Sequence, residues 1–253
     1  MSGRVFQQDK RATLFGMPLD LVTMDETVEA CRRLVDSRKP AQHVVLNAGK
    51  VVLASRDQRL REIIGSADIV NADGQSVVWA GRLLGRKVPQ RVTGIDLMHQ
   101  LLAEAARSGW PVYFLGARKE VLSEAIVRLL QSHPTLIIAG SHHGYFHDDR
   151  SMAAAIRDSG ARLLFVAMPS PMKEYFVASE MSRFGPLLVV GIGGSLDVVA
   201  GRVRRAPPWM QRAGLEWLFR FVQEPRKMWR RYLLGNATFA WLTLKELLRP
   251  ARS

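Results

Sequence analysis

Cysteine, long apolar runs, and repeated or low-complexity segments are scarce or missing in this sequence. The single cysteine, Cys31, excludes an internal disulfide and is typical of a reducing compartment. No uninterrupted apolar run approaches the ~20 residues that a membrane-spanning helix needs, and the most apolar stretch, 187–201, contains Asp197 and several glycines. Residues 1–16 lack the apolar core of a signal peptide. These absences predict a soluble or peripheral cytoplasmic protein.

Positive charge is distributed unevenly along the chain. Residues 202–253, called the tail here, hold 12 Lys and Arg against 3 Asp and Glu, whereas residues 1–201, the body, hold 24 against 20. Four of the six tryptophans also lie in the tail, namely Trp209, Trp217, Trp229 and Trp241. A chain of 253 residues can bury one substantial core and carry an appendage. We therefore predict that body and tail have different roles.

The body alternates short apolar runs with longer helical patterns. The runs predict strands at His43–Leu46, Ile69–Val70, Val112–Leu115, Leu136–Ala139, Leu163–Ala167 and Leu187–Val190. Helices are expected at 25–37, 57–65, 75–84, 95–108, 118–131, 150–159 and 172–184, with Thr23 or Asp25 and Ser151 as N-caps and with Gly109 and Gly160 at helix ends. This pattern indicates an α/β fold with a Rossmann-like, mostly parallel sheet flanked by helices.

Glycine and polar residues follow the predicted strands, where ligands bind in such sheets. The turns are Asn71-Ala72-Asp73-Gly74, Gly116-Ala117, Pro169-Ser170-Pro171-Met172-Lys173-Glu174 and Gly191-Ile192-Gly193-Gly194-Ser195-Leu196-Asp197. Glycine lets the backbone approach a ligand closely, and N–H groups at the start of the next helix favour phosphate. Tight-turn geometry alone explains any one of these segments, but four at one edge favour a nucleotide pocket.

Further motifs occur in a definite order along the chain. They are Arg91-Val92-Thr93-Gly94-Ile95-Asp96-Leu97, Gly144-Tyr145-Phe146, Arg204-Arg205-Ala206-Pro207-Pro208-Trp209, Gly214-Leu215-Glu216-Trp217-Leu218-Phe219-Arg220 and Glu224-Pro225-Arg226. With the strand-end turns, they make the chain resemble the WecG/TagA/CpsF family of glycosyltransferases (family 26) from about residue 12 to about 235. The resemblance implies an inverting enzyme with a UDP-sugar donor and a polyprenyl-diphosphate-linked sugar acceptor. It also implies self-association and a C-terminal appendage that docks on a membrane and helps complete the active site.

Two residues are expected to carry the chemistry. An inverting transfer needs a base that takes the proton of the acceptor hydroxyl, and the resemblance gives this role to Asp73. From the residues alone, Asp73 equally suits an Asx-turn or a helix cap. Arg91 is expected to grip the diphosphate and to offset charge on the leaving UDP, although an arginine in the basic loop 82–91 is ordinarily solvated. Thr93 is an expected substrate contact, and Asp96 is expected to cap or anchor the following helix.

The sequence departs from the family pattern at two expected binding positions. Asn47 is a predicted contact to donor or acceptor, or else a turn amide, and Val45 stands where the family usually has threonine. Lys173 replaces the glutamine of the family's Pro-Lys-Gln-Glu, so it is expected to meet phosphate or a carboxylated sugar. Glu174 is expected to bind a sugar hydroxyl, or to sit in a first helical turn where acids are favoured. The remaining expected contacts are Asn71, Gly74, Gly116, Gly193, Gly194 and Asp197, together with tail arginines among Arg204, Arg205, Arg212, Arg220 and Arg226.

A polar cluster around Gly144-Tyr145-Phe146 suggests a metal at first sight. It contains His142, His143, His147, Asp148 and Asp149. The chain has no Asp-x-Asp motif, and the spacing fits no standard zinc pattern. We therefore expect no divalent metal and no cofactor, and interpret the cluster as a polar loop over the pocket.

The tail predicts basic amphipathic helices interrupted at Pro225 and Gly235. Lys and Arg beside interfacial Trp suit an anionic bilayer surface, which places the protein on the inner face of the cytoplasmic membrane. An RNA-binding protein is the alternative, because Arg and Trp also serve phosphates and bases, but the body shows no RNA-binding motif, so nucleic acid is not expected. A dinucleotide-dependent oxidoreductase is disfavoured because no G-x-G-x-x-G follows the first strand. The expected sugar is glucose, or N-acetylmannosamine or its uronic acid, for an exopolysaccharide or cell-envelope polymer.

Overall fold

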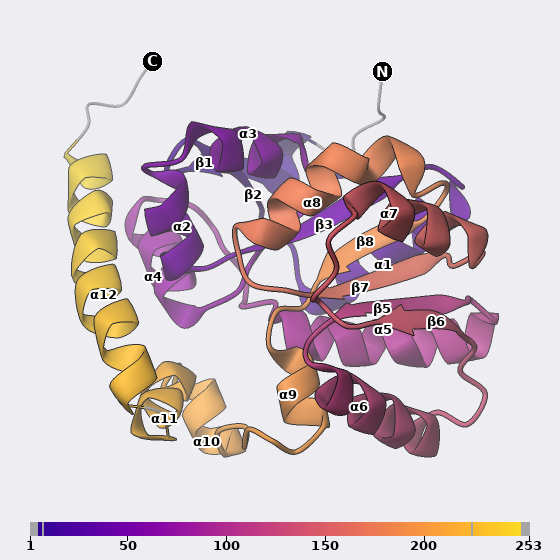
Figure 1. The fold of residues 1–253 in the computed structure, drawn as a ribbon. Coiled ribbons are helices and arrows are strands. Elements are labelled where there is room, and N and C mark those ends of the chain that lie inside the picture. The colour runs from indigo at the N-terminus through magenta and orange to yellow at the C-terminus, as the bar shows by residue number, and fades with distance from the viewer. Residues whose placement is uncertain (1–4, 7, 224, 249–253) are drawn as a thin grey trace.

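The computed structural model describes residues 5–6, 8–223 and 225–248, with side chains except those of 8, 220 and 226–234 (Figure 1). Its centre is a six-stranded parallel sheet in the order β4-β3-β8-β7-β5-β6. The strands are β3 (Ala41–Leu46), β4 (Ile69–Ala72), β5 (Val112–Gly116), β6 (Ile138–His142), β7 (Leu163–Ala167) and β8 (Leu188–Gly191). Each predicted strand overlaps one of these, and the predicted α/β fold with a Rossmann-like parallel sheet is confirmed.

Helices pack on both faces of the sheet (Figure 1). The predicted helices correspond to α1 (Met24–Asp36), α3 (Gln58–Ser66), α4 (Gln75–Leu83), α5 (Gly94–Ser108), α6 (Lys119–Ser132), α7 (Asp149–Asp158) and α8 (Met172–Glu180). Two short helices, α2 (Ala48–Ala54) and α9 (Ser195–Val199), were not predicted. The 3-10 turns are η1 (Gln8–Lys10) and η2 (Met181–Arg183), and η2 ends the segment predicted as one helix to residue 184.

Strand β5 shows how the sheet separates two apolar layers. Its Val112 and Phe114 belong to the cluster that includes α1, α5 and α6, whereas Tyr113 and Leu115 belong to the cluster that includes α7 and α8. Successive side chains of a strand point to opposite faces, so a continuous apolar run fills both layers. This is why the buried strands were recognisable in the sequence.

The expected helix caps are partly confirmed. Thr23 is the N-cap of α1 and forms a capping box with Glu26, and Gly109 ends α5 in the left-handed conformation. The N-cap of α7 is Asp148 rather than Ser151, because the Asp148 carboxylate accepts hydrogen bonds from the backbone of Arg150 and of Ser151. A carboxylate at this position also interacts favourably with the helix dipole.

An unpredicted hairpin lies beside the edge strand β4. It consists of β1 (Arg11–Leu14) and β2 (Met17–Asp20), which pair antiparallel. Oδ2 of the buried Asp20 accepts a hydrogen bond of 2.7 Å from the backbone N–H of Val70 in β4. The hairpin thereby covers part of an edge that would otherwise expose unpaired backbone groups.

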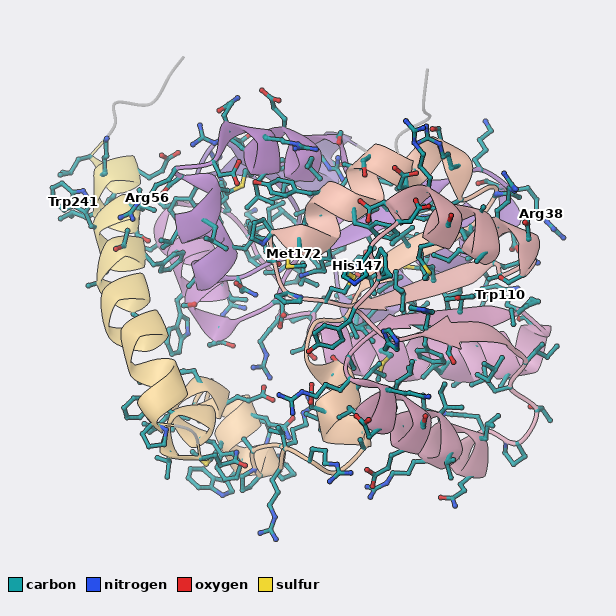
Figure 2. The ribbon with its side chains drawn as sticks, in the orientation of Figure 1. Arg38, Arg56, Trp110, His147, Met172 and Trp241 are labelled. Atoms are coloured by element: carbon teal, nitrogen blue, oxygen red, sulfur yellow. The ribbon has the colours of Figure 1, made fainter. Side chains whose placement is uncertain are left out.

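The described tail consists of α10 (Pro208–Arg212), α11 (Glu216–Gln223) and α12 (Pro225–Leu247). Pro225 begins α12 as expected, but the predicted interruption at Gly235 is wrong, because one interior glycine costs a helix only about 1 kcal/mol. Phe239 of α12 is buried with its ring 5.4 Å from that of Phe15, whereas Trp241 is 62% exposed on the outer side of α12 (Figure 2). Across the described ranges, no helix has the length and apolar character needed to span a bilayer.

Candidate active site

Asp73 lies at the carboxyl end of β4, beside the end of β3. Its backbone N–H donates to the carbonyl of Leu46, the last residue of β3, at 2.8 Å. Gly74 follows with a φ of 132°, which favours glycine, and a Cβ built there would lie 3.7 Å from Cβ of Asn47. Asp73 is partly exposed. A carboxylate at this edge can reach a substrate that binds outside the strand ends.

The two asparagines expected to bind substrate have partners inside the protein. Asn47 is the N-cap of α2, and its Oδ1 accepts from the backbone N–H of Lys50 at 2.9 Å. Asn71 is fully buried in β4, and its Oδ1 lies 2.8 Å from Nε2 of His43. An amide oxygen only accepts hydrogen bonds, so Nε2 of His43 is the donor. Burial lowers the pKa of His43 to about 4, which keeps this imidazole neutral.

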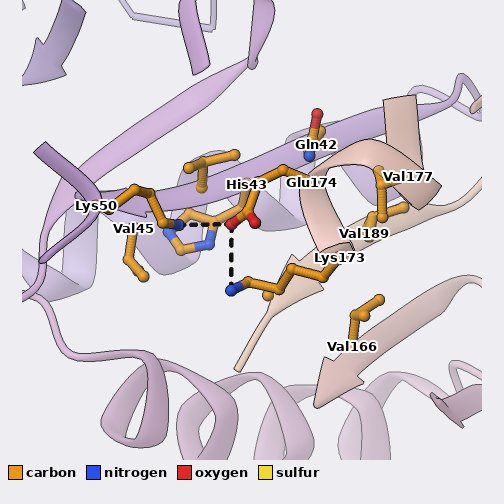
Figure 3. A pocket seen from close by; sticks show the side chains of 11 residues that line it. Gln42, His43, Val45, Lys50, Val166, Lys173, Glu174, Val177 and Val189 are labelled. Carbon is orange, nitrogen blue, oxygen red and sulfur yellow. Dashed lines mark ion pairs between the residues drawn. The ribbon is translucent and has the colours of Figure 1, made fainter. Parts of the chain in front are cut away.

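Three charged side chains meet in the interior behind this edge (Figure 3). Oε1 of Glu174 lies 2.8 Å from Nζ of Lys50 and 3.1 Å from Nζ of Lys173, and all three residues are buried. Ser170 donates to the same carboxylate oxygen at 3.0 Å and accepts from Lys173. We call Lys50, Lys173 and Glu174 the buried charge cluster.

Burial and charge oppose each other in the buried charge cluster. Burial lowers the pKa of Lys173 to about 8, and Lys50 adds to this effect, while the charges of Glu174 and Asp73 oppose it. Burial alone would raise the pKa of Glu174, but the two lysines lower it on balance. The charge of Asp73 has the smallest of these effects on Lys173.

Lys173 reaches the strand ends across Gly191. A Cβ built on Gly191 would lie 3.0 Å from Cε of Lys173, so the lysine stem crosses the last residue of β8. The side chain lines a narrow recess formed mainly by β3, β7, β8 and α8 (Figure 3). An ammonium group held there can interact with an anionic part of a substrate.

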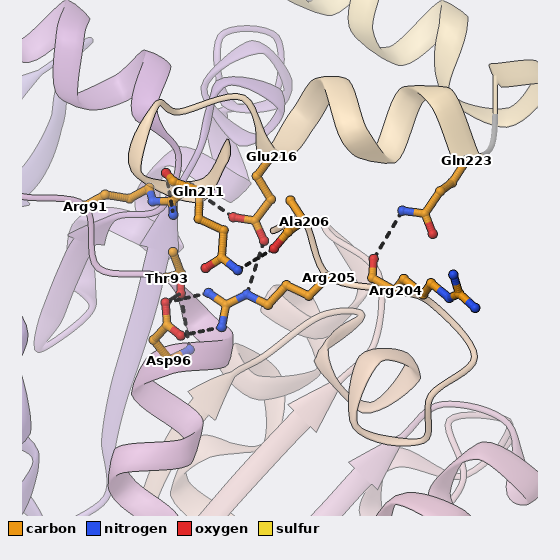
Figure 4. A network of polar contacts seen from close by, with 9 residues as sticks. All are labelled: Arg91, Thr93, Asp96, Arg204, Arg205, Ala206, Gln211, Glu216 and Gln223. Atoms are coloured by element: carbon orange, nitrogen blue, oxygen red, sulfur yellow. Dashed lines mark hydrogen bonds and ion pairs between the residues drawn. The ribbon is translucent and has the colours of Figure 1, made fainter. Parts of the chain in front are cut away.

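A second group of charges joins the body to the tail (Figure 4). Arg91 donates to Oε2 of Glu216 at 3.0 Å, and Nε of Arg205 lies 3.4 Å from Oε1 of the same glutamate. Arg205 also donates to both carboxylate oxygens of Asp96, at 2.6 and 2.7 Å. We call Arg91, Asp96, Arg205 and Glu216 the interface ion network. It holds the two predicted arginines beside each other although they are far apart in the sequence.

The start of α5 supports the interface ion network. Thr93 is the N-cap of α5, and its hydroxyl donates to Oδ2 of Asp96 at 2.6 Å. Burial alone would raise the pKa of Asp96, but hydrogen bonds from Arg205 and Thr93 lower it. Asp96 thus anchors the helix start as expected, and its carboxylate additionally binds the tail.

The glycines at the other strand ends have different surroundings. Gly116 has a φ of 125°, and a Cβ there would lie 2.5 Å from the Ala167 carbonyl, so close packing of β5 on β7 requires glycine. At Gly193, with a φ of 51°, a Cβ would meet no atom within 4 Å. The nearest atom to a Cβ on Gly194 is Oδ2 of Asp197, at 3.7 Å. The turn after β8 is therefore open enough to admit a ligand.

The remaining predicted residues are dispersed. Arg204 and Arg212 are exposed, and the Arg204 carbonyl accepts from Gln223 at 3.1 Å. The side chains of Arg220 and Arg226 lie outside the described residues. Around Gly144, His142 and His143 form hydrogen bonds within residues 142–145. In the part of the chain that the structure describes, no three His, Cys, Asp or Glu side chains gather to hold a metal ion.

Sequence reasoning did not identify Lys50, His43 and Glu216. Lys50 is a lone charge in the otherwise apolar segment 48–54, and Glu216 is the sole acidic residue between residues 198 and 223. A charge that is isolated in this way often has a buried or interface partner. That signal was available, but Glu174, which pairs with Lys50, and Arg91, which pairs with Glu216, each lie more than 100 residues from their partner and could not be assigned.

Comparison with known proteins identifies the family of this chain. The sequence profile described as the glycosyl transferase WecG/TagA/CpsF family matches residues 12–253. The N-acetylglucosaminyldiphosphoundecaprenol N-acetyl-beta-D-mannosaminyltransferase of Bacillus spizizenii is 36% identical over 199 residues, which span 79% of this chain and 77% of the relative. The resemblance of the sequence motifs is thereby confirmed, and the chain belongs to the WecG/TagA/CpsF family of glycosyltransferases.

Proposed function

We propose that this protein transfers a hexosyl unit, with inversion, from a UDP-sugar to a polyprenyl-diphosphate-linked sugar. The observation that carries the proposal is the position of Asp73, which follows the carboxyl end of β4 and is partly exposed there. The acceptor class follows the name of the Bacillus relative. The product would be an intermediate of a bacterial exopolysaccharide or cell-envelope polymer.

Asp73 removes the proton from the acceptor hydroxyl as its oxygen attacks the anomeric carbon, and UDP departs from the opposite side. Arg91 offsets the charge that develops on the departing diphosphate. To do so it exchanges its bond to Glu216 for one to phosphate, and Glu216 keeps Arg205 as a partner. Divalent metal has no part in this scheme.

The sugar is the finer part of the proposal. N-acetylmannosamine is supported by the name of the relative, and its uronic acid is supported by the positive charge of Lys173, whose stem crosses the end of β8. Glucose is the third donor to compare. The enzyme works from the inner face of the cytoplasmic membrane, where a lipid-linked acceptor would be presented.

The test is transfer by wild type and Asp73→Asn with UDP-linked N-acetylmannosamine, its uronic acid and glucose. The acceptor is a polyprenyl-diphosphate sugar in anionic vesicles, with a chelator present. Loss of a catalytic base lowers the rate by about 10²–10⁴-fold while UDP binding persists. Asp158→Asn, at an exposed position of α7, is the matched control and retains full activity. Equal rates for Asp73→Asn and wild type would remove Asp73 as the base, and no transfer from any donor would refute the reaction.

A further inference from the structure

The two tryptophans of the body differ sharply in exposure. Trp110 is 3% exposed in the core, whereas Trp79 on α4 is 53% exposed. Leu83, one helical turn further along α4, is 62% exposed. Residues four apart lie on the same face of a helix. Helix α4 therefore presents an apolar face that its own fold does not bury.

This face adjoins the tail. A Cβ built on Gly214, between α10 and α11, would lie 3.5 Å from Cη2 of Trp79. Trp209 of α10 and Trp217 of α11 are 60% and 42% exposed. We use the name apolar surface for Trp79 and Leu83 of α4 together with the exposed Trp209 and Trp217 of the adjoining tail helices. Figure 1 shows α4, α10 and α11 at the end of the molecule opposite the edge strand β6.

The apolar surface has a basic border. Residues 75–95 contain four Lys and Arg and no Asp or Glu. The loop after α4 is held on the helix by Arg82, which donates to the carbonyls of Val88 and Pro89, and it leaves Arg86 and Lys87 exposed. Arg204 and Arg212 are exposed on the tail side. The body thus repeats the combination of tryptophan and positive charge that marks the tail.

We propose that the apolar surface, with its basic border, docks on an anionic lipid bilayer, so that helix α4 of the body contacts the membrane together with the tail. Exposed tryptophan and leucine insert at the headgroup boundary, and Lys and Arg attract anionic lipid. A second copy of this chain is a poorer occupant, because two such surfaces would place like charges opposite each other. The inference rests on the proposed function, because that function requires an acceptor that is held in a membrane.

The test places a polarity-sensitive fluorophore at the apolar surface of the full chain. Cys31 is fully buried, and burial raises its pKa to about 12, so it does not compete for a thiol reagent. Leu83→Cys carries the label, and Leu130→Cys on α6, where the leucine is 37% exposed, is the matched control. Vesicles of phosphatidylcholine with phosphatidylglycerol are compared with vesicles of phosphatidylcholine alone.

Docking predicts a blue shift of the label at position 83 with the anionic vesicles and none at position 130. Replacing Arg86 and Lys87 by Gln should lower vesicle affinity about fivefold for each charge removed. An unshifted label at position 83 while the protein still sediments with anionic vesicles would confine docking to the tail and overturn the inference. A shift that grows with protein concentration without vesicles would identify a self-association surface instead.

This readout is independent of catalysis. Docking at position 83 without sugar transfer would refute the proposed function and leave the surface assigned. Transfer to the lipid-linked acceptor without docking at position 83 would refute the inference alone.

Discussion

Two glutamates of this protein each bind two cations, but in opposite surroundings. Glu174 lies in the interior with Lys50 and Lys173, and its side chain is 2% exposed. Glu216 lies between body and tail with Arg91 and Arg205, and its side chain is 17% exposed. Desolvation makes a buried ion pair costly to form and more costly to break, whereas a partly solvated pair can exchange partners cheaply. The buried charge cluster is thus suited to hold a fixed geometry, and the interface ion network to rearrange when substrate binds.

The largest effect on stability is expected for Glu174→Gln. The substitution leaves two buried lysines without their carboxylate, so we expect the free energy of unfolding to fall by about 3–5 kcal/mol. Urea denaturation measures the change. Glu62→Gln is the control, because Glu62 lies at an exposed position of α3 and its replacement should change the free energy of unfolding by about 0.5 kcal/mol or less. A loss below 1 kcal/mol for Glu174→Gln would show that the cluster is effectively solvated.

The pH dependence of stability gives the next largest effect. Burial holds the pKa of Lys173 at about 8 in the folded chain, against 10.5 ordinarily. Between these values the unfolded chain binds more protons, so the free energy of unfolding rises with pH by up to about 1.4 kcal/mol per unit. Below pH 8 both states are protonated and the full destabilisation is present. The stability of Lys173→Met relative to wild type should therefore be highest at pH 7 and should fall as pH rises towards 10.

Denaturation of both proteins at several pH values between 7 and 10 checks this expectation. Comparing the two proteins cancels the titration of tyrosines and other lysines that they share. A difference that stays constant with pH would mean that Lys173 titrates near its ordinary pKa when folded.

The smallest effect on stability is expected for Glu216→Gln. Its partners are partly exposed, so the loss should be about 1 kcal/mol or less. The attachment of the tail should nevertheless weaken, and trypsin should cleave faster after the arginines at 202–212. Glu62→Gln, at an exposed position of α3, should leave cleavage unchanged. Cleavage as slow as in wild type would show that apolar contacts such as Phe239 hold the tail without the ion network.

The sequence predicted the parts of the fold that follow from local pattern. Continuous apolar runs marked the sheet strands because both faces of those strands are buried, and Asp73 was placed correctly at the end of β4. The β1–β2 hairpin was not predicted because each strand has four residues, too few to show a clear alternation of apolar and polar residues. Helix α2 was not predicted because its seven residues span barely two turns, too few to show a helical period.

The charged groups of the site were less predictable. Lys50 and Glu174, like Arg205 and Asp96, are separated by more than 100 residues, and nothing local shows which charges pair. Arg205 was expected near the diphosphate, and its guanidinium instead binds Asp96 and Glu216 in this structure. Pairing of this kind depends on the strand order, which makes β4, β3 and β8 neighbours in the sheet although they are far apart in the sequence.

The position of β8 has a consequence for biosynthesis. It is the last strand to be made, yet it lies between β3 and β7 in the middle of the sheet. Until residue 191 has been translated, the nascent chain can form only two sheet fragments, β4 with β3 and β7 with β5 and β6, each with an open edge. Open edges pair readily with other chains, so we expect ribosome-bound intermediates of this protein to be exposed to mispairing for longer than those of a sheet assembled in sequence order.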